Sequence, residues 1–229
     1  MAFTLDKVVP WGRSFHEYVH MFDMTEDHLG LRILGCADGP ASFNCGMQQR
    51  GHSMVSCDPI YQFSARQIET RIDETYDVVY EQMLQNIEGF VWKTIPSPKA
   101  LGRARMDAMR AFLDDYAHGR DEGRYVAASL PALPFGRWQF DLVLCSHFLF
   151  LYTGQLTRAF HRQAAKELCR VAREVRIFPL LDLGRKVSPY VEEVVQDARR
   201  AGLFAEVRRV PYEFQRGGNE MLRIWTEAS

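Results

Sequence analysis

The sequence lacks long hydrophobic runs, an excess of one charge and the pattern of a secretory signal. No apolar segment approaches the ~20 residues that a membrane-spanning helix needs. Lysine and arginine number 28 against 29 acidic residues, so no overall field draws the chain to nucleic acid or to a membrane surface. The segment Met1–Lys7 has no basic stretch followed by an apolar one, so we expect no secretory signal there.

Paired cysteines are also missing. The five cysteines are scattered, odd in number and never spaced as C-x-x-C. This pattern argues against a disulfide framework and predicts a reducing, cytoplasmic location. Three of them, Cys36, Cys57 and Cys145, lie near the carboxyl ends of predicted strands, where thiols can be small core residues or ligands of a soft metal. Because paired spacing is absent, we favour the core and predict no metal site.

One zinc-protease pattern, H-E-x-x-H, occurs at His16–His20. The same predicted helix, Phe15–Phe22, has an apolar stripe that includes Tyr18 and Val19, so both histidines should flank it toward solvent. No convincing third ligand follows in the expected context. We interpret the pattern as a chance match.

What the sequence does have is a regular alternation of short apolar segments with amphipathic ones. The alternation predicts an α/β fold with a doubly wound, mostly parallel sheet. The last two predicted strands are joined without a helix, which indicates antiparallel pairing. The predicted strands are Leu31–Leu34, Ser53–Cys57, Tyr125–Ala128, Phe140–Cys145, Glu174–Phe178, Ala205–Val210 and Glu220–Trp225. Helices are predicted at Phe15–Phe22, Ala41–Arg50, Gly154–Val171 and Ser188–Gly202, the last with Ser188 as N-cap.

A long connection after the second strand, residues 62–123, departs from this alternation. Apolar residues recur in it at spacings of three and four, which predicts a pair of helices, the second starting at Ser97-Pro98. We treat 1–229 as a single domain in which this helical insert is either extra core or a lid over a substrate pocket. Arg103, Arg105 and Arg110 alternate with aspartates, which is typical of a solvated helix face.

Two predicted strand ends are suited to hold a nucleoside. The segment Leu31–Pro40 is a strand that leads into a turn with Gly35 and Gly39, and Asp58 follows the next strand. In a doubly wound sheet such ends lie side by side. Glycines let the backbone approach a ligand closely, and a carboxylate can accept hydrogen bonds from two ribose hydroxyls.

Together with Leu133-Pro134-Phe135 and Phe140–Ser146, these segments resemble the class I S-adenosylmethionine-dependent methyltransferases. The resemblance implies a Rossmann-like sheet of seven strands with the last one antiparallel, and S-adenosylmethionine as cofactor. Two departures are Ala37, where the family usually has a second glycine, and Ser129, where it often has an acidic residue that contacts the adenine. The implied cofactor-binding residues are Gly35, Cys36, Ala37, Asp38, Gly39, Asp58, Pro59, Ile60, Ser129, Leu130 and Ser146, with Arg13 and Tyr18 placed over the methionine carboxylate.

The function expected from the resemblance is methyl transfer to an unidentified, small-molecule acceptor. His147 is the candidate general base, and its other interpretation is a pocket-lining or capping residue. Further loop candidates are Tyr61, Tyr152, Asp182, Tyr212 and Glu213. One alternative is a non-catalytic nucleoside-binding module. Another is an NAD-type oxidoreductase, which is disfavoured because Gly35-x-x-x-Gly39 lacks the G-x-G-x-x-G spacing that cradles phosphates.

Overall fold

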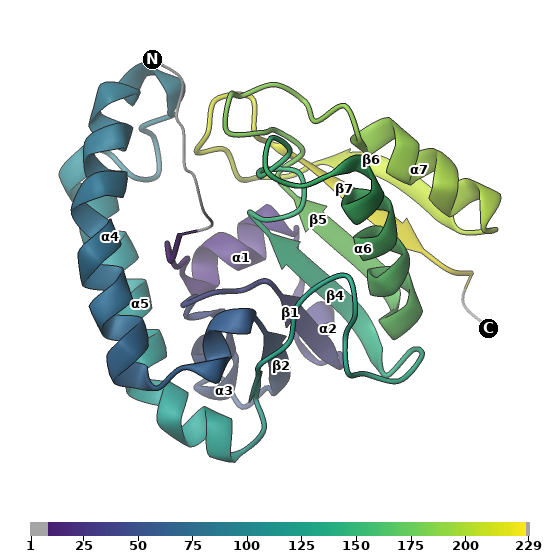
Figure 1. The fold of residues 1–229 in the computed structure, drawn as a ribbon, viewed down its shortest axis with the longest axis horizontal. Coiled ribbons are helices and arrows are strands. Elements are labelled where there is room, and N and C mark those ends of the chain that lie inside the picture. The colour runs from purple at the N-terminus through teal and green to yellow at the C-terminus, as the bar shows by residue number, and fades with distance from the viewer. Residues whose placement is uncertain (1–8, 228–229) are drawn as a thin grey trace.

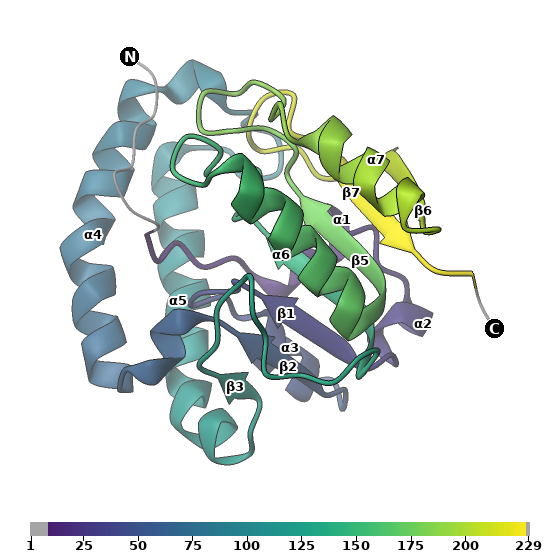
Figure 2. The ribbon, with the colours of Figure 1, turned by 45° about the vertical axis from the view of Figure 1, so that its right-hand side comes forward.

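The computed structural model describes residues 9–227, so the expectation for Met1–Lys7 lies outside it. The described chain folds as a sheet between two layers of helices (Figures 1 and 2). The strands are β1 (Ile33–Cys36), β2 (Met54–Cys57), β3 (Tyr125–Val126), β4 (Phe140–Ser146), β5 (Ala172–Phe178), β6 (Phe204–Arg209) and β7 (Glu220–Trp225). The helices are α1 (Phe15–Met21), α2 (Glu26–Leu29), α3 (Phe43–Gln48), α4 (Ala65–Gln85), α5 (Pro98–Asp121), α6 (Arg158–Val171) and α7 (Val191–Arg200), with 3-10 turns η1 (Pro59–Gln62) and η2 (Ile87–Gly89).

The sheet has seven strands in the order β3-β2-β1-β4-β5-β7-β6. Strands β1 to β5 pair in parallel, and β7 runs antiparallel to both of its neighbours. The predicted fold class, a mostly parallel seven-stranded sheet with an antiparallel last strand, is confirmed. Because β7 lies between β5 and β6, the antiparallel strand is inside the sheet, and β6 forms the edge on that side.

Each face of the sheet buries its own apolar core. On one face, Val143 and Ile177 pack with α6 and α7 through Leu168 and Val194. On the other face, strand residues such as Leu144 pack with α1 and α3. Strands covered on both sides need near-continuous apolar sequence, which is why β4 could be recognised from its composition.

The insert forms two long helices, as its periodicity predicts. Helix α4 begins at a capping box in which Ser64 and Gln67 bond reciprocally, and α5 begins at the predicted Ser97-Pro98 pair. The two helices stand side by side, and the arrowhead of β4 points toward them (Figure 1). Among residues 9–227 no helix has the length and apolarity to span a bilayer.

Several local predictions are wrong. Helix α6 begins at Arg158 with Thr157 as N-cap, four residues after the predicted Gly154. Helix α7 begins at Val191 with Tyr190 as N-cap, and Ser188 Oγ instead accepts the Tyr190 amide at 3.4 Å and the Thr153 hydroxyl at 2.7 Å. Helix α2 was not predicted, being a single short turn. Strand β1 starts two residues later than expected, at Ile33. The two-residue shift carries the strand into the glycine turn.

Candidate functional site

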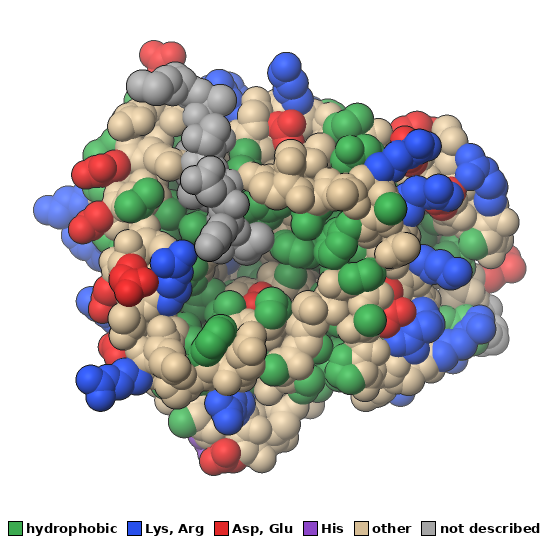
Figure 3. Space-filling model, in the orientation of Figure 1, with side chains coloured by type: hydrophobic (Ala, Val, Ile, Leu, Met, Phe, Trp, Pro, Cys, Tyr) green, Lys and Arg blue, Asp and Glu red, His purple; other side chains and the backbone are tan. Residues whose placement is uncertain are grey.

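A cavity of about 1120 Å³ opens where the loops after β1, β2 and β4 meet. The segment before α1 and the inner sides of α4 and α5 complete its walls. Hydrophobic side chains gather around a hollow on the face seen in Figure 3. Every predicted site residue except Gly35 lines this cavity: Arg13, Tyr18, Cys36, Ala37, Asp38, Gly39, Asp58, Pro59, Ile60, Ser129, Leu130, Ser146 and His147.

The turn after β1 is shaped by its own aspartate. A Cβ on Gly35 would lie only 1.8 Å from Asp38 Oδ2, so glycine is needed there because the Asp38 carboxylate folds back over it. The expectation that Gly35 admits a ligand is therefore wrong. Gly39, with a φ of 54° and open space where a Cβ would be, is the position that leaves room for one.

Asp58 lies against this turn, as predicted. Its Oδ2 accepts the Gly39 amide at 2.9 Å, and its Oδ1 accepts the Ile60 amide at 2.9 Å. The two oxygens of a carboxylate offer about four acceptor sites, so about two remain for hydroxyls of a ligand. Burial raises the pKa of Asp58 to about 6, because the two amide bonds only partly offset the loss of water.

Asp38 is held by two hydroxyls. Tyr18 donates to its Oδ1 at 2.9 Å and Ser56 donates to its Oδ2 at 2.7 Å. Burial raises the pKa of Asp38 to about 7, with the nearby Asp58 charge acting in the same direction. The hydroxyl of Tyr18 is thereby engaged with the turn, which makes Tyr18 a positioning residue for Asp38.

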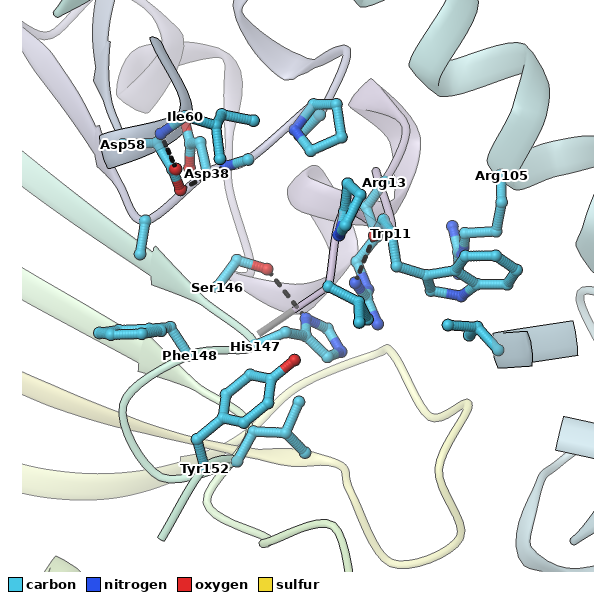
Figure 4. A pocket seen from close by; sticks show the side chains of 18 of the residues that line it. Trp11, Arg13, Asp38, Asp58, Ile60, Arg105, Ser146, His147, Phe148 and Tyr152 are labelled. Carbon is cyan, nitrogen blue, oxygen red and sulfur yellow. Dashed lines mark hydrogen bonds between the residues drawn. The ribbon is translucent and has the colours of Figure 1, made fainter. Parts of the chain in front are cut away.

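His147 follows β4 in a left-handed backbone conformation, with a φ of 51°. Such strain in a non-glycine residue costs about 1–3 kcal/mol and is typical of functional sites. Its Nδ1 lies 2.9 Å from Ser146 Oγ (Figure 4). Burial, together with Arg13 and Arg105, lowers the pKa of His147 well below its ordinary value. The imidazole is neutral at physiological pH and is a weak proton acceptor.

Arg105, from α5, is buried, and the predicted solvated position is wrong. Its guanidinium donates to both carboxylate oxygens of Glu17 at 2.6 Å, and Tyr212 donates to the same carboxylate at 2.8 Å. Although burial opposes ionisation, Arg105 brings the pKa of Glu17 down to about 2. This network joins the insert to α1 at the base of the cavity.

Arg13 lies beside this pair but has no carboxylate partner among residues 9–227. Its Nη1 donates to the Trp11 carbonyl at 2.9 Å, and its Nε is buried without a partner. Burial, followed by the charge of Arg105, lowers the pKa of Arg13. A half-buried guanidinium whose Nε is buried without a partner is a candidate binding group for an anion.

The cavity has two chemically different ends (Figure 4). We name them by their residues. The Asp58 end contains Asp38, Asp58 and Ile60, and the Arg13 end contains Trp11, Arg13, Arg105, His147 and Tyr152. Ser129 and Leu130 line the same cavity and follow β3, which pairs with β2 in the sheet. Apolar side chains extend the Arg13 end toward the insert and the loop before β7: Val79, Met83, Phe90, Phe148, Leu151, Leu183 and Phe214.

At the Arg13 end, sequence reasoning missed Trp11, Arg105 and the apolar extension of the cavity. The position of Arg105 carried a usable signal, because it follows Leu101 by four residues and precedes Ala108 by three, inside an apolar stripe. Of the loop candidates, Tyr152 lines the cavity, whereas the Tyr61 hydroxyl donates to the Gly39 carbonyl at 2.7 Å. Tyr212 bonds to Glu17, and Asp182 and Glu213 lie outside the lining.

The cysteine and histidine motifs hold no metal-binding cluster within residues 9–227. Cys36 lies in register between Cys57 and Cys145, and all three are buried in the apolar core. Hydrogen bonding to Cys57 and burial raise the pKa of Cys36 well above its ordinary value, so this thiol stays protonated. His16 and His20 are exposed, as predicted.

No protein-family model matches the chain. The uncharacterized protein MJ0045 of Methanocaldococcus jannaschii is 32% identical over 223 residues, which cover 96% of this chain and 97% of that protein.

Two solved structures are similar at low identity. Magnesium protoporphyrin IX methyltransferase from Synechocystis PCC 6803 is 12% identical with a TM-score of 0.46, over 88% of this chain and 73% of that one. The 1,6-didemethyltoxoflavin-N1-methyltransferase of Burkholderia thailandensis is 13% identical with a TM-score of 0.47, over 93% of this chain and 78% of that one.

Proposed function

The chain belongs to the same family as the uncharacterized protein MJ0045 of Methanocaldococcus jannaschii, and we propose that it is an S-adenosylmethionine-dependent methyltransferase acting on a small molecule. The observation that carries the proposal is the placement of Asp58 against the Gly39 turn at the mouth of one large cavity. A carboxylate at the end of β2, beside the turn after β1, is the arrangement that a nucleoside requires in a doubly wound sheet.

The residues of the cavity suit the cofactor. The two free acceptor sites of Asp58 match two ribose hydroxyls, and the Ser129–Leu130 and Ile60 side of the cavity offers an edge and an apolar face for adenine. The unpartnered Arg13 Nε suits a carboxylate such as that of the methionine group. When bound, the cofactor supplies a methyl group on a positively charged sulfur, which is already a good leaving group.

The chain's own residues then act mainly by binding and alignment. Ser146 ends β4 and His147 follows it, between the two ends of the cavity, where an acceptor can meet the methyl group (Figure 4). Neutral His147 orients the acceptor through a hydrogen bond and accepts a proton only weakly, which argues against a central role as general base. The insert of residues 62–123 serves as the lid that keeps water out, since Val79 and Met83 of α4 line the cavity.

A non-catalytic nucleoside module and an NAD-type oxidoreductase fit less well. A module without turnover needs no space beyond the nucleoside, yet the cavity continues into the apolar Arg13 end. A dinucleotide needs a phosphate cradle, and the Asp38 carboxylate occupies the turn where one would lie. The free thiols of all five cysteines support a cytoplasmic location.

Calorimetric titration with S-adenosylhomocysteine, the demethylated cofactor, tests the proposal. We expect saturable binding at one site, no binding of NAD, and a loss of about 1.5–3 kcal/mol in the Asp58→Ala variant through lost ribose contacts. Asp114→Ala, which removes an exposed carboxylate from α5, is the matched control and should bind normally. Absence of binding, or tighter binding of NAD, contradicts the proposal.

A further inference from the structure

The side chains at the Arg13 end of the cavity carry a net positive charge, which restricts the ligands that can bind there. Arg13 and Arg105 together carry two positive charges, and Glu17 supplies one negative charge, which is bonded to Arg105 and not to Arg13. One net positive charge is left at this end. Because a buried charge is costly without a partner, a ligand with an anionic group is favoured here and an ammonium group is disfavoured.

Within residues 9–227, no carboxylate that could hold a cationic acceptor lines this end of the cavity. The acidic side chains lining the cavity among residues 9–227 are Asp38, Asp58 and Glu74. The first two lie together at the opposite end (Figure 4). Glu74 is an exposed residue of α4 that pairs with Arg71 at 3.2 Å. An amine acceptor would therefore reach this end as its ammonium form without a counter-ion, and it would have to lose a proton before its nitrogen lone pair could attack the methyl group.

Burial raises the pKa of an acid and the nearby positive charge lowers it, so the two effects must be compared. Glu17, in the same cluster, shows which effect is larger. It is buried, and its pKa nevertheless falls to about 2 because Arg105 contacts it. Burial lowers the pKa of His147, and the charges of the same two guanidinium groups act in the same direction. At this end, the positive charge outweighs desolvation for an acid that reaches a guanidinium.

We propose that the acceptor is a largely apolar molecule with a carboxyl or acidic hydroxyl group, bound as its anion at the Arg13 end and methylated on that oxygen. This inference rests on the proposed function. A guanidinium has five N–H donors and Arg13 uses one for the Trp11 carbonyl, so it can bind a cofactor carboxylate and the acceptor oxygen together. The apolar body lies among Met83, Phe90 and Phe214.

The reaction then needs no base in the protein. The acceptor loses its proton to water on binding as the anion. Its oxygen lone pair forms the new bond to the methyl carbon while the carbon–sulfur bond breaks, and that electron pair remains on sulfur. The products are a neutral methyl ester or ether and a neutral thioether. Loss of the negative charge weakens the attraction to Arg13 and favours product release.

Matched probes test the inference on protein saturated with S-adenosylhomocysteine. We expect 2-naphthoate to bind at least tenfold more tightly than 2-naphthylmethylammonium, which has the same apolar body. The pKa of bound 4-nitrophenol, read from its absorbance, should be lower than in water. Arg13→Gln should abolish the preference for naphthoate, whereas Arg66→Gln, an exposed arginine outside the cavity, should keep it.

The outcomes separate the two claims. Equal or tighter binding of the ammonium probe, no binding of naphthoate, or an unshifted nitrophenol pKa overturns the inference while leaving the cofactor site intact. If S-adenosylhomocysteine itself does not bind, the proposed function fails, and the same probes in the cofactor-free protein still report whether the Arg13 end prefers anions. The nitrophenol measurement on the unaltered protein keeps the test valid even if Arg13→Gln does not fold.

Discussion

Asp38 is the residue whose role differs most from what the sequence predicts. Its place in the turn after β1 was visible, but its side chain folds over Gly35 because Tyr18 and Ser56 hold it there. Both partners lie about twenty residues away in sequence, in α1 and β2. The local sequence pattern predicts that a polar residue lies in a turn, but the orientation of its side chain depends on the packing of other elements.

Ala37 provides a direct test of strain in this turn. It adopts a φ of 57°, a left-handed conformation that costs a non-glycine residue about 1–2 kcal/mol. Ala37→Gly removes this strain, but the glycine makes the unfolded chain more flexible, which lowers the stability of the folded state by about 0.5–1 kcal/mol. We expect a net gain in stability of up to about 1 kcal/mol, measured by urea unfolding. A clear loss of stability would mean that the methyl group of Ala37 makes contacts that outweigh the strain.

Asp58 should make cofactor binding depend on pH. In the free protein burial raises its pKa to about 6, and only the ionised carboxylate accepts bonds from both ribose hydroxyls. Affinity for S-adenosylhomocysteine should therefore be constant well above pH 6 and fall by up to about tenfold per unit below it. Calorimetry across pH 5–8 measures this, and Asp58→Asn should flatten that dependence. An unchanged slope in Asp58→Asn would assign the titration to another group, such as Asp38.

At the scale of elements, the insert was predictable as two helices, with a lid over the site as one of two interpretations, but the burial of Arg105 in it was not. The periodicity that identified α5 placed Arg105 in its apolar stripe, between Leu101 and Ala108. The alternation of arginine with aspartate suggested exposure instead. Which of the two patterns prevails depends on Glu17, in a helix 88 positions earlier in the chain. A buried charge can be read from sequence only when its partner is known.

The Arg105–Glu17 pair should be the main link between the insert and the rest of the fold. Arg105→Gln leaves the Glu17 carboxylate buried without its cation, which costs about 3–5 kcal/mol. Arg103→Gln, an exposed position on the same helix, is the control and should change stability by less than about 0.5 kcal/mol. Urea unfolding at pH 7 measures both. Similar small losses in the two variants would mean that the ion pair adds little to the other links of the insert, such as the Arg124–Asp115 pair and the Val91–Phe214 backbone bond.

At the scale of the whole molecule, the topology was predictable because its rules are general. Alternation of strands and helices gives a parallel sheet, and the helix-free connection between the last two strands gives the antiparallel pair. The cavity was only half predictable. The Asp58 end comes from strand ends whose adjacency the fold dictates, whereas the Arg13 end combines the segment before α1, the insert and the loop before β7. No rule of topology brings those three segments together.

A crystal structure with bound S-adenosylhomocysteine tests the central claim most directly. The account predicts that the Asp58 carboxylate contacts both ribose hydroxyls and that the sulfur faces the Arg13 end, next to His147. A nucleoside bound away from Asp58, or a sulfur pointing away from Arg13 and His147, would contradict it.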